Sequence, residues 1–78
     1  MTDDIQEKIQ RITEEIASKP SADGYYRRGK LYWRVGDRQH AITDFNQAVQ
    51  MDADSPAAIY LNMTRDVMDF YNTDLYNP

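Results

Sequence analysis

The sequence predicts an all-α protein of four helices in one small domain. Apolar residues recur at spacings of three and four along most of the chain, which is the period of an amphipathic helix. Serine, aspartate, glycine and proline fall between these periodic segments, where helices start and stop. With 78 residues, the chain buries only about 60% of the surface that its unfolded form exposes, so we expect a small core.

The first predicted helix covers residues 4–19. Asp4 followed by Glu7 resembles a capping box at its start, and Pro20 ends it. Its apolar residues form a single stripe with spacings of 4, 3 and 4: Ile5, Ile9, Ile12 and Ile16. Because the stripe is narrow, this helix needs a neighbour to cover it.

The second and third helices are predicted on either side of a tight turn. Ser21 is a good N-cap for the second helix, and Gly36 stands where a left-handed C-terminal cap favours glycine. Asp37 then caps the third helix. The third helix carries a broad apolar face, made of Ala41, Ile42, Phe45, Ala48 and Val49. The short turn predicts that the two helices run antiparallel.

Ser55 and Pro56 mark the start of a fourth helix, predicted for residues 56–72. Its sequence places four apolar residues on one face, with Tyr60 and Met68 alongside: Ile59, Met63, Val67 and Phe70. Residues 73–78 are predicted to be an irregular tail.

Gly29 lies inside the second predicted helix, where glycine costs about 1 kcal/mol relative to alanine. A glycine at such a position lets another backbone come close. If the helices fold back about the Gly36 turn, Ala41 is predicted to face Gly29. Tyr32 and Phe45 are then expected to fill the space further out.

Several of these residues stand at characteristic spacings within residues 22–55: Tyr25, Gly29, Tyr32, Gly36, Asp37, Ala41, Phe45 and Ala48. Through them the segment resembles a tetratricopeptide repeat, a helical pair of 34 residues. Two positions depart from the family pattern. Arg28 replaces the usual leucine, which predicts looser or more exposed packing there, and Ala53 replaces the usual proline.

The resemblance implies antiparallel helix–turn–helix architecture, with four helices in a short right-handed superhelical stack. We expect one domain over residues 1–78, in which the helix 4–19 is the second half of a preceding repeat. Asn62, Met63 and Asp66 replace the family's leucine, glycine and tyrosine, so the last helix is expected to be a terminal cap. Met1 and the two capped ends predict a complete small protein.

The net charge of −4 is unevenly distributed. Residues 20–36 carry one acid and four bases, whereas the segments before and after them are acidic. An acidic chain disfavours a role in general nucleic-acid binding. The chain has no cysteine, no basic N-terminal region and no long apolar run, so we expect a cytoplasmic protein without a membrane span.

The basic segment, residues 20–36, also places two aromatic residues on one helical side, opposite the face of Gly29. This side is made of Tyr26, Lys30, Trp33 and Arg34. The resemblance implies that it lines a concave groove for peptides, with Tyr60 and Thr64 joining from the fourth helix. An aromatic ring beside a cation suits an acidic or C-terminal peptide segment. Lys30 replaces the asparagine of the repeats that clamp a terminal carboxylate, so that particular activity is not implied.

No catalytic residue, metal site or cofactor is predicted. His40 is the single histidine, and Asp52 and Asp54 lack the glycine and glutamate of a calcium loop. The resemblance implies a non-enzymatic module that binds another protein. As alternatives, Tyr26 and Trp33 cover the core or form a dimer contact; in the second case the chain is a small structural protein that self-associates through its aromatic face. A third hypothesis, stacking of single-stranded nucleic acid on these rings, is disfavoured by the acidic charge.

Overall fold

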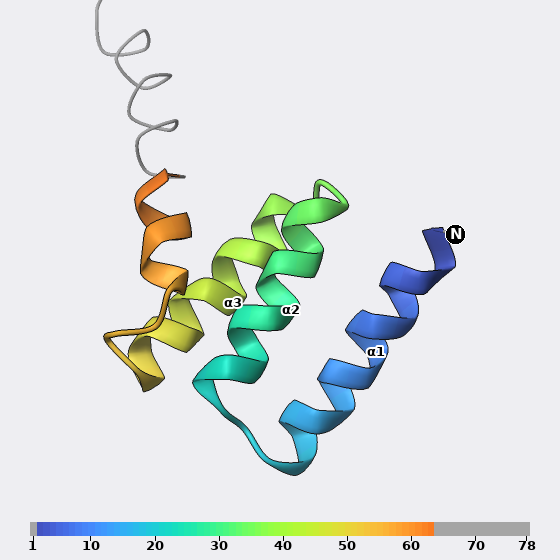
Figure 1. Cartoon of the computed structure of the whole chain (residues 1–78), viewed down its shortest axis with the longest axis horizontal. Helices are drawn as coiled ribbons and strands as arrows, with labels where there is room; N and C mark the ends of the chain where they lie inside the picture. The colour runs from blue at the N-terminus through green and yellow to red at the C-terminus, as the bar shows by residue number, and fades with distance from the viewer. Residues whose placement is uncertain (1, 64–78) are drawn as a thin grey trace, which may run out of the picture.

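The computed structural model describes residues 2–63 and contains three helices followed by the start of a fourth. They are α1 (Thr2–Ser18), α2 (Ala22–Arg34) and α3 (Arg38–Met51), and residues 57–63 are also helical. In Figure 1, α2 lies between α1 and α3, and the 57–63 segment lies on the far side from α1. The predicted all-α class is confirmed, because no residue from 2 to 63 lies in a strand.

The helix starts follow the predicted caps. The Ser21 hydroxyl accepts a hydrogen bond from the Gly24 N–H at 3.0 Å, and the Asp37 carboxylate accepts one from the His40 N–H at 3.2 Å. Gly36 has a φ of 84°, the left-handed conformation that favours glycine, as predicted. The capping box at Asp4 is wrong, because α1 already begins at Thr2 and Asp4 lies inside its first turn.

The core lies where α3 packs against α2 and against the helical segment after it. The fully buried residues are Ala41, Phe45, Ala48 and Ala57. On α1, the isoleucine stripe is buried at Ile9, Ile12 and Ile16, so this helix is covered by its neighbour as expected. The predicted apolar faces of the first and third helices are confirmed.

Gly29 is a point of close approach, but its partner differs from the one predicted. A Cβ atom added at Gly29 would lie 2.6 Å and 2.8 Å from two ring carbons of Phe45. The prediction that Ala41 faces Gly29, with Phe45 further out, is therefore wrong. The Phe45 ring reaches across from α3 and lies directly on the α2 backbone, which is why this position accepts no side chain.

The prediction of looser or more exposed packing around Arg28 is also wrong. Its guanidinium donates two hydrogen bonds to the Asp44 carboxylate, both at 2.8 Å, and a third to the Thr13 hydroxyl at 3.2 Å. The exposed fractions of the Arg28 and Asp44 side chains are 18% and 5%. The hydrogen bonds that Arg28 donates to Asp44 raise the pKa of the Arg28 guanidinium above its already high value. The packing is thus tight and largely buried, and it joins α1, α2 and α3.

The 57–63 segment turns a different face to the core from the one its apolar pattern predicts. Tyr60 and Leu61 pack against the core, whereas Ile59 and Met63 are 62% and 51% exposed. The Ser55 hydroxyl accepts a hydrogen bond from the Ala57 N–H at 3.2 Å, so the predicted cap is present. The rest of the predicted helix 56–72 and the tail 73–78 lie outside the described residues.

Candidate binding site

Four aromatic rings from three helical segments form one cluster. Phe45 of α3 lies at its centre, with its ring centroid 6.2 Å from that of Tyr26, 6.4 Å from Trp33 and 4.8 Å from Tyr60. Tyr60 in turn lies 6.0 Å from Tyr26 and 6.1 Å from Trp33. The tilted and edge-on angles are those that aromatic pairs prefer. This cluster fixes the 57–63 segment against both α2 and α3.

Two cations lie over rings of this cluster. The Lys30 ammonium is 4.7 Å from the centre of the Tyr26 ring, and the Arg38 guanidinium is 5.2 Å from that of Trp33. Such contacts are worth about 0.5–1 kcal/mol at exposed sites. Positive charge therefore lies beside half-buried aromatic surface, as the sequence predicted for Lys30.

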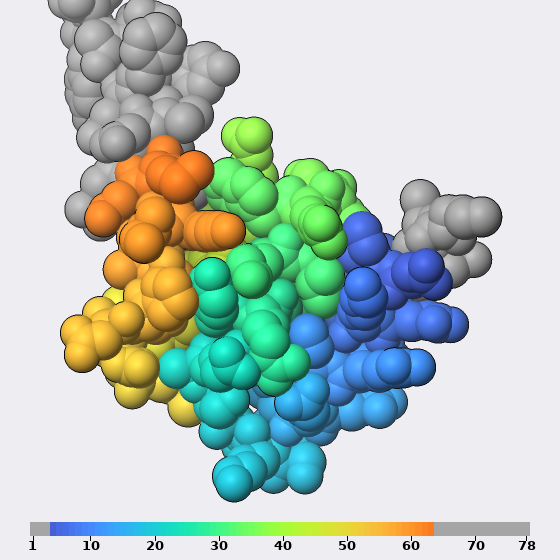
Figure 2. Space-filling view, in the orientation of Figure 1, coloured from blue at the N-terminus to red at the C-terminus, as the bar shows by residue number. Residues whose placement is uncertain are grey.

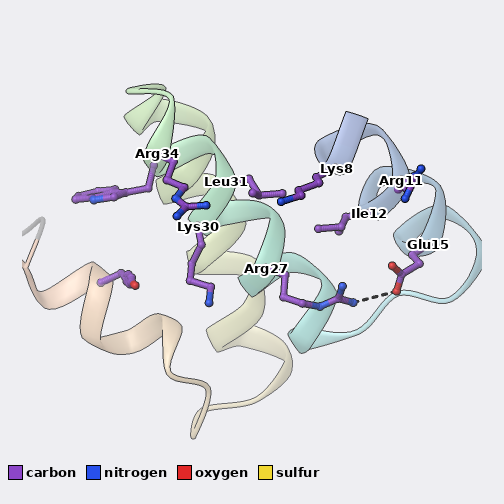
Figure 3. Close-up of a pocket in the computed structure, with 10 residues that line it drawn as sticks. Lys8, Arg11, Ile12, Glu15, Arg27, Lys30, Leu31 and Arg34 are labelled. Atoms are coloured by element: carbon purple, nitrogen blue, oxygen red, sulfur yellow. Dashed lines mark hydrogen bonds and ion pairs between the residues drawn. The ribbon is translucent and has the colours of Figure 1, made fainter. Parts of the chain in front are cut away.

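A hollow of about 650 Å³ opens between α1, α2 and the 57–63 segment. We call it the α1–α2 hollow. Its lining consists of Lys8, Arg11, Ile12, Glu15, Arg27, Lys30, Leu31, Trp33, Arg34 and Tyr60. In Figure 3, Lys8 and Ile12 of α1 point toward Leu31 of α2, while Lys30 and Arg34 project from α2 along the same side. Figure 2 shows α1 and the 57–63 segment on opposite flanks of α2.

The α1–α2 hollow is strongly basic. Five of the nine basic residues of the sequence line it, and among the described residues only one acid, Glu15, does so. That carboxylate accepts a hydrogen bond from Arg27 at 2.9 Å, and Arg27 also binds Asp23 at 2.8 Å. The hydrogen bonds that Arg27 donates to Glu15 and Asp23 raise the pKa of Arg27 above its ordinary value. The four remaining cations give the hollow its net positive charge.

The structure brings together most of the predicted groove residues. Lys30, Trp33, Arg34 and Tyr60 line the hollow, and Tyr26 joins them through the ring cluster. Thr64 lies outside the described residues. Lys8, Arg11 and Arg27 were not predicted as groove residues from the sequence. The available signal was that Lys8 and Arg11 flank the isoleucine stripe three residues apart, but nothing in the sequence indicates which groove they face.

The other polar residues considered from the sequence have local structural partners. His40 contacts the Asp37 carboxylate through its Nδ1 atom at 2.7 Å, and Asp52 accepts a hydrogen bond from the Asp54 N–H at 3.0 Å. Among the side chains of residues 4–63, no three His, Asp or Glu lie close enough together to hold a metal ion. These contacts are those of helix caps and turns.

Comparison with known families assigns the central segment. Residues 22–55 match the tetratricopeptide repeat family. The matched segment has the sequence pattern of a tetratricopeptide repeat. No curated protein and no solved structure matched the chain in the corresponding comparisons. The matched range coincides with the repeat predicted from the spacing, and it comprises α2, α3 and the turns that flank them.

The repeat signature occupies the inside of the fold. Ala41, Phe45 and Ala48 are fully buried, Gly29 receives the Phe45 ring, and Tyr25 and Tyr32 pack against the core. A tetratricopeptide repeat indicates a module for protein–protein interaction. No helix among the described residues is both long enough and apolar enough to cross a membrane.

Proposed function

We propose that this chain is a non-enzymatic interaction module that binds an acidic segment of a partner protein in the α1–α2 hollow. The observation that carries the proposal is the concentration of basic residues there, five lining residues against one paired acid. In a chain whose net charge is −4, such a local excess attracts an anionic partner while the rest of the surface repels it.

The apolar part of the lining supplies the rest of the binding surface. Ile12 and Leu31 come from α1 and α2, and Trp33 and Tyr60 border them from the ring cluster. An apolar or aromatic anchor surrounded by cations resembles the usual arrangement of an interface, where the buried centre gives affinity and the charged rim gives selectivity. We assign the role of apolar anchor to Trp33, and recognition of the partner's carboxylates to Lys30 and Arg34.

Reversing the two α2 charges tests the proposal. Two fluorescently labelled peptides are titrated with the protein. One carries several glutamates and one leucine, and in the other glutamines replace the glutamates. We expect wild type to prefer the glutamate peptide by at least about tenfold, or 1.4 kcal/mol. Lys30→Glu combined with Arg34→Glu should remove this preference, and loss of the Lys30–Tyr26 contact should lower the melting temperature by no more than a few degrees. Lys19→Glu, an exposed lysine outside the hollow, is the control for the change in charge. Equal affinity of wild type for both peptides would contradict the proposal.

The alternative, self-association through the aromatic face, makes a different prediction for Trp33→Ala. The Trp33 ring packs against Phe45 and Tyr60 and also lines the hollow, and these contacts all lie within one copy of the chain. We therefore expect Trp33→Ala to lower the melting temperature and to leave the mass in sedimentation equilibrium unchanged. A wild-type dimer that becomes a monomer in Trp33→Ala would favour self-association instead.

A further inference from the structure

Three of the basic residues that line the α1–α2 hollow form a row on α2. Arg27, Lys30 and Arg34 are separated by three and four residues, so they lie on one side of the helix along about 10 Å of its axis. Lys8 points toward α2 from α1, and Arg11 of α1 also lines the hollow (Figure 3). Two helices therefore contribute cations to one space.

Most of these cations have no anionic neighbour. In the described part of the chain, four of the five lining cations take part in no ion pair: Lys8, Arg11, Lys30 and Arg34. Like charges one turn apart on a helix, such as Lys30 and Arg34, repel each other. A bound anion would remove this repulsion, and it would stabilise the folded chain because it binds only the arrangement that folding creates.

The spacing of the cations favours linked phosphates over the carboxylates of a peptide. An extended peptide turns every second side chain to the same side, about 7 Å apart, so it offers about two carboxylates along the row on α2. Linked phosphates carry charge on every unit, and their oxygens accept the paired hydrogen bonds that a guanidinium donates. The volume of about 650 Å³ lies within the range of sites for small molecules.

We infer that the α1–α2 hollow is a binding site for a small soluble anion that carries several linked or clustered phosphate groups. The row on α2 binds the phosphates from one side, and Lys8 and Arg11 bind them from α1. The inference does not depend on the proposed function, because it requires the cations and no protein partner. Such an anion would compete with an acidic segment for Lys30 and Arg34.

Tripolyphosphate is the probe for this site, and inorganic phosphate is the control with a single group. We expect isothermal titration calorimetry to show one tripolyphosphate per chain, bound at least about tenfold more tightly than inorganic phosphate. Tripolyphosphate should also raise the melting temperature. Absence of binding, or equal affinity for the two anions, would overturn the inference. The titration with glutamate peptides tests the proposed function separately, so the failure of one is distinguishable from the failure of the other.

Phosphate groups on a lipid surface are the other source of the same chemistry. Phosphatidylcholine vesicles that contain phosphatidylinositol bisphosphate are sedimented with the protein, and vesicles of phosphatidylcholine alone are the control. We expect the protein to stay in the supernatant with both, because a hollow between helices suits a small molecule better than a broad charged surface. Sedimentation with the phosphoinositide vesicles alone would overturn the assignment to a soluble anion.

Charge variants test whether the anion lies in the hollow. Lys8→Gln combined with Arg34→Gln removes one exposed cation from each helix, so it should weaken tripolyphosphate binding at least about tenfold while the melting temperature stays close to that of wild type. Lys19→Gln, just after α1 and outside the hollow, should leave the affinity within about twofold. Glu15→Gln removes the one acid among the described lining residues and should tighten binding. Unchanged affinity in the double variant, or weaker binding in Glu15→Gln, would overturn the inference.

Discussion

Replacement of Asp44 by alanine is expected to cost about 3–5 kcal/mol of unfolding free energy, which is the usual effect of removing one member of a buried ion pair. The Arg28 guanidinium would keep its charge and lose two hydrogen bonds of 2.8 Å in a place where its side chain is only 18% exposed. Domains of this size are stable by only a few kcal/mol, so the variant should be largely unfolded at 37 °C. Chemical denaturation followed by circular dichroism measures the loss.

The chain offers a matched control for this experiment. Asp23 also accepts a hydrogen bond of 2.8 Å from an arginine, Arg27, but its side chain is 73% exposed. Asp23→Ala removes a contact of the same length between the same residue types and should cost less than about 0.5 kcal/mol. Similar losses in both variants would mean that burial does not set the energy of the Arg28–Asp44 pair. Arg28→Leu with Asp44→Leu should recover much of the stability lost in Asp44→Ala, because it leaves no buried charge unpaired.

Replacement of Gly29 by leucine is the second substitution with a large expected effect. The first atom of any side chain would already lie 2.6 Å from the Phe45 ring, so α2 and α3 must separate or the ring must move. Overpacking of this kind costs about 1–3 kcal/mol or more. Thermal unfolding should show a melting temperature lower by several degrees. A melting temperature equal to that of wild type would contradict the contact between Gly29 and Phe45.

A double-mutant cycle identifies the partner of Gly29. Gly29→Ala alone adds the clashing Cβ atom, and Phe45→Leu replaces the planar ring with a smaller side chain. If the ring is the obstacle, alanine at position 29 should cost at least about 0.5 kcal/mol less in the Phe45→Leu background than in wild type. Additive losses would show that another group limits the space above Gly29.

The sequence was sufficient for the features that depend on short separations along the chain. The helical class, the caps at Ser21 and Asp37 and the left-handed turn at Gly36 each depend on chemistry within about four residues. The apolar face of α3 followed from its spacing as well, and Ala41 and Phe45 are buried as expected. The fixed spacing of the repeat also predicted that α2 pairs with α3.

Predictions that required the orientation of one helix against another were less successful. The spacing identified Gly29 as a contact point but named Ala41, because it could not show how far the Phe45 ring reaches. The apolar pattern of the last helix indicated a stripe through Ile59, yet the structure exposes Ile59 and turns Tyr60 inward. Helix rotation is set by the summed packing of all neighbours, and the pattern of one helix leaves several rotations open.

The sequence by itself therefore determined that residues 2–63 are mainly helical, that Ser21 and Asp37 cap the second and third helices, and which residues form the repeat core. Tertiary structure alone decided that Arg28 pairs with Asp44, 16 residues away, and with Thr13 on α1. It also decided that Lys8 and Arg11 share a hollow with Lys30 and Arg34. The reason is that local spacing fixes the conformation of each helix, whereas ion pairs and grooves depend on the angle and register at which three separate helices meet.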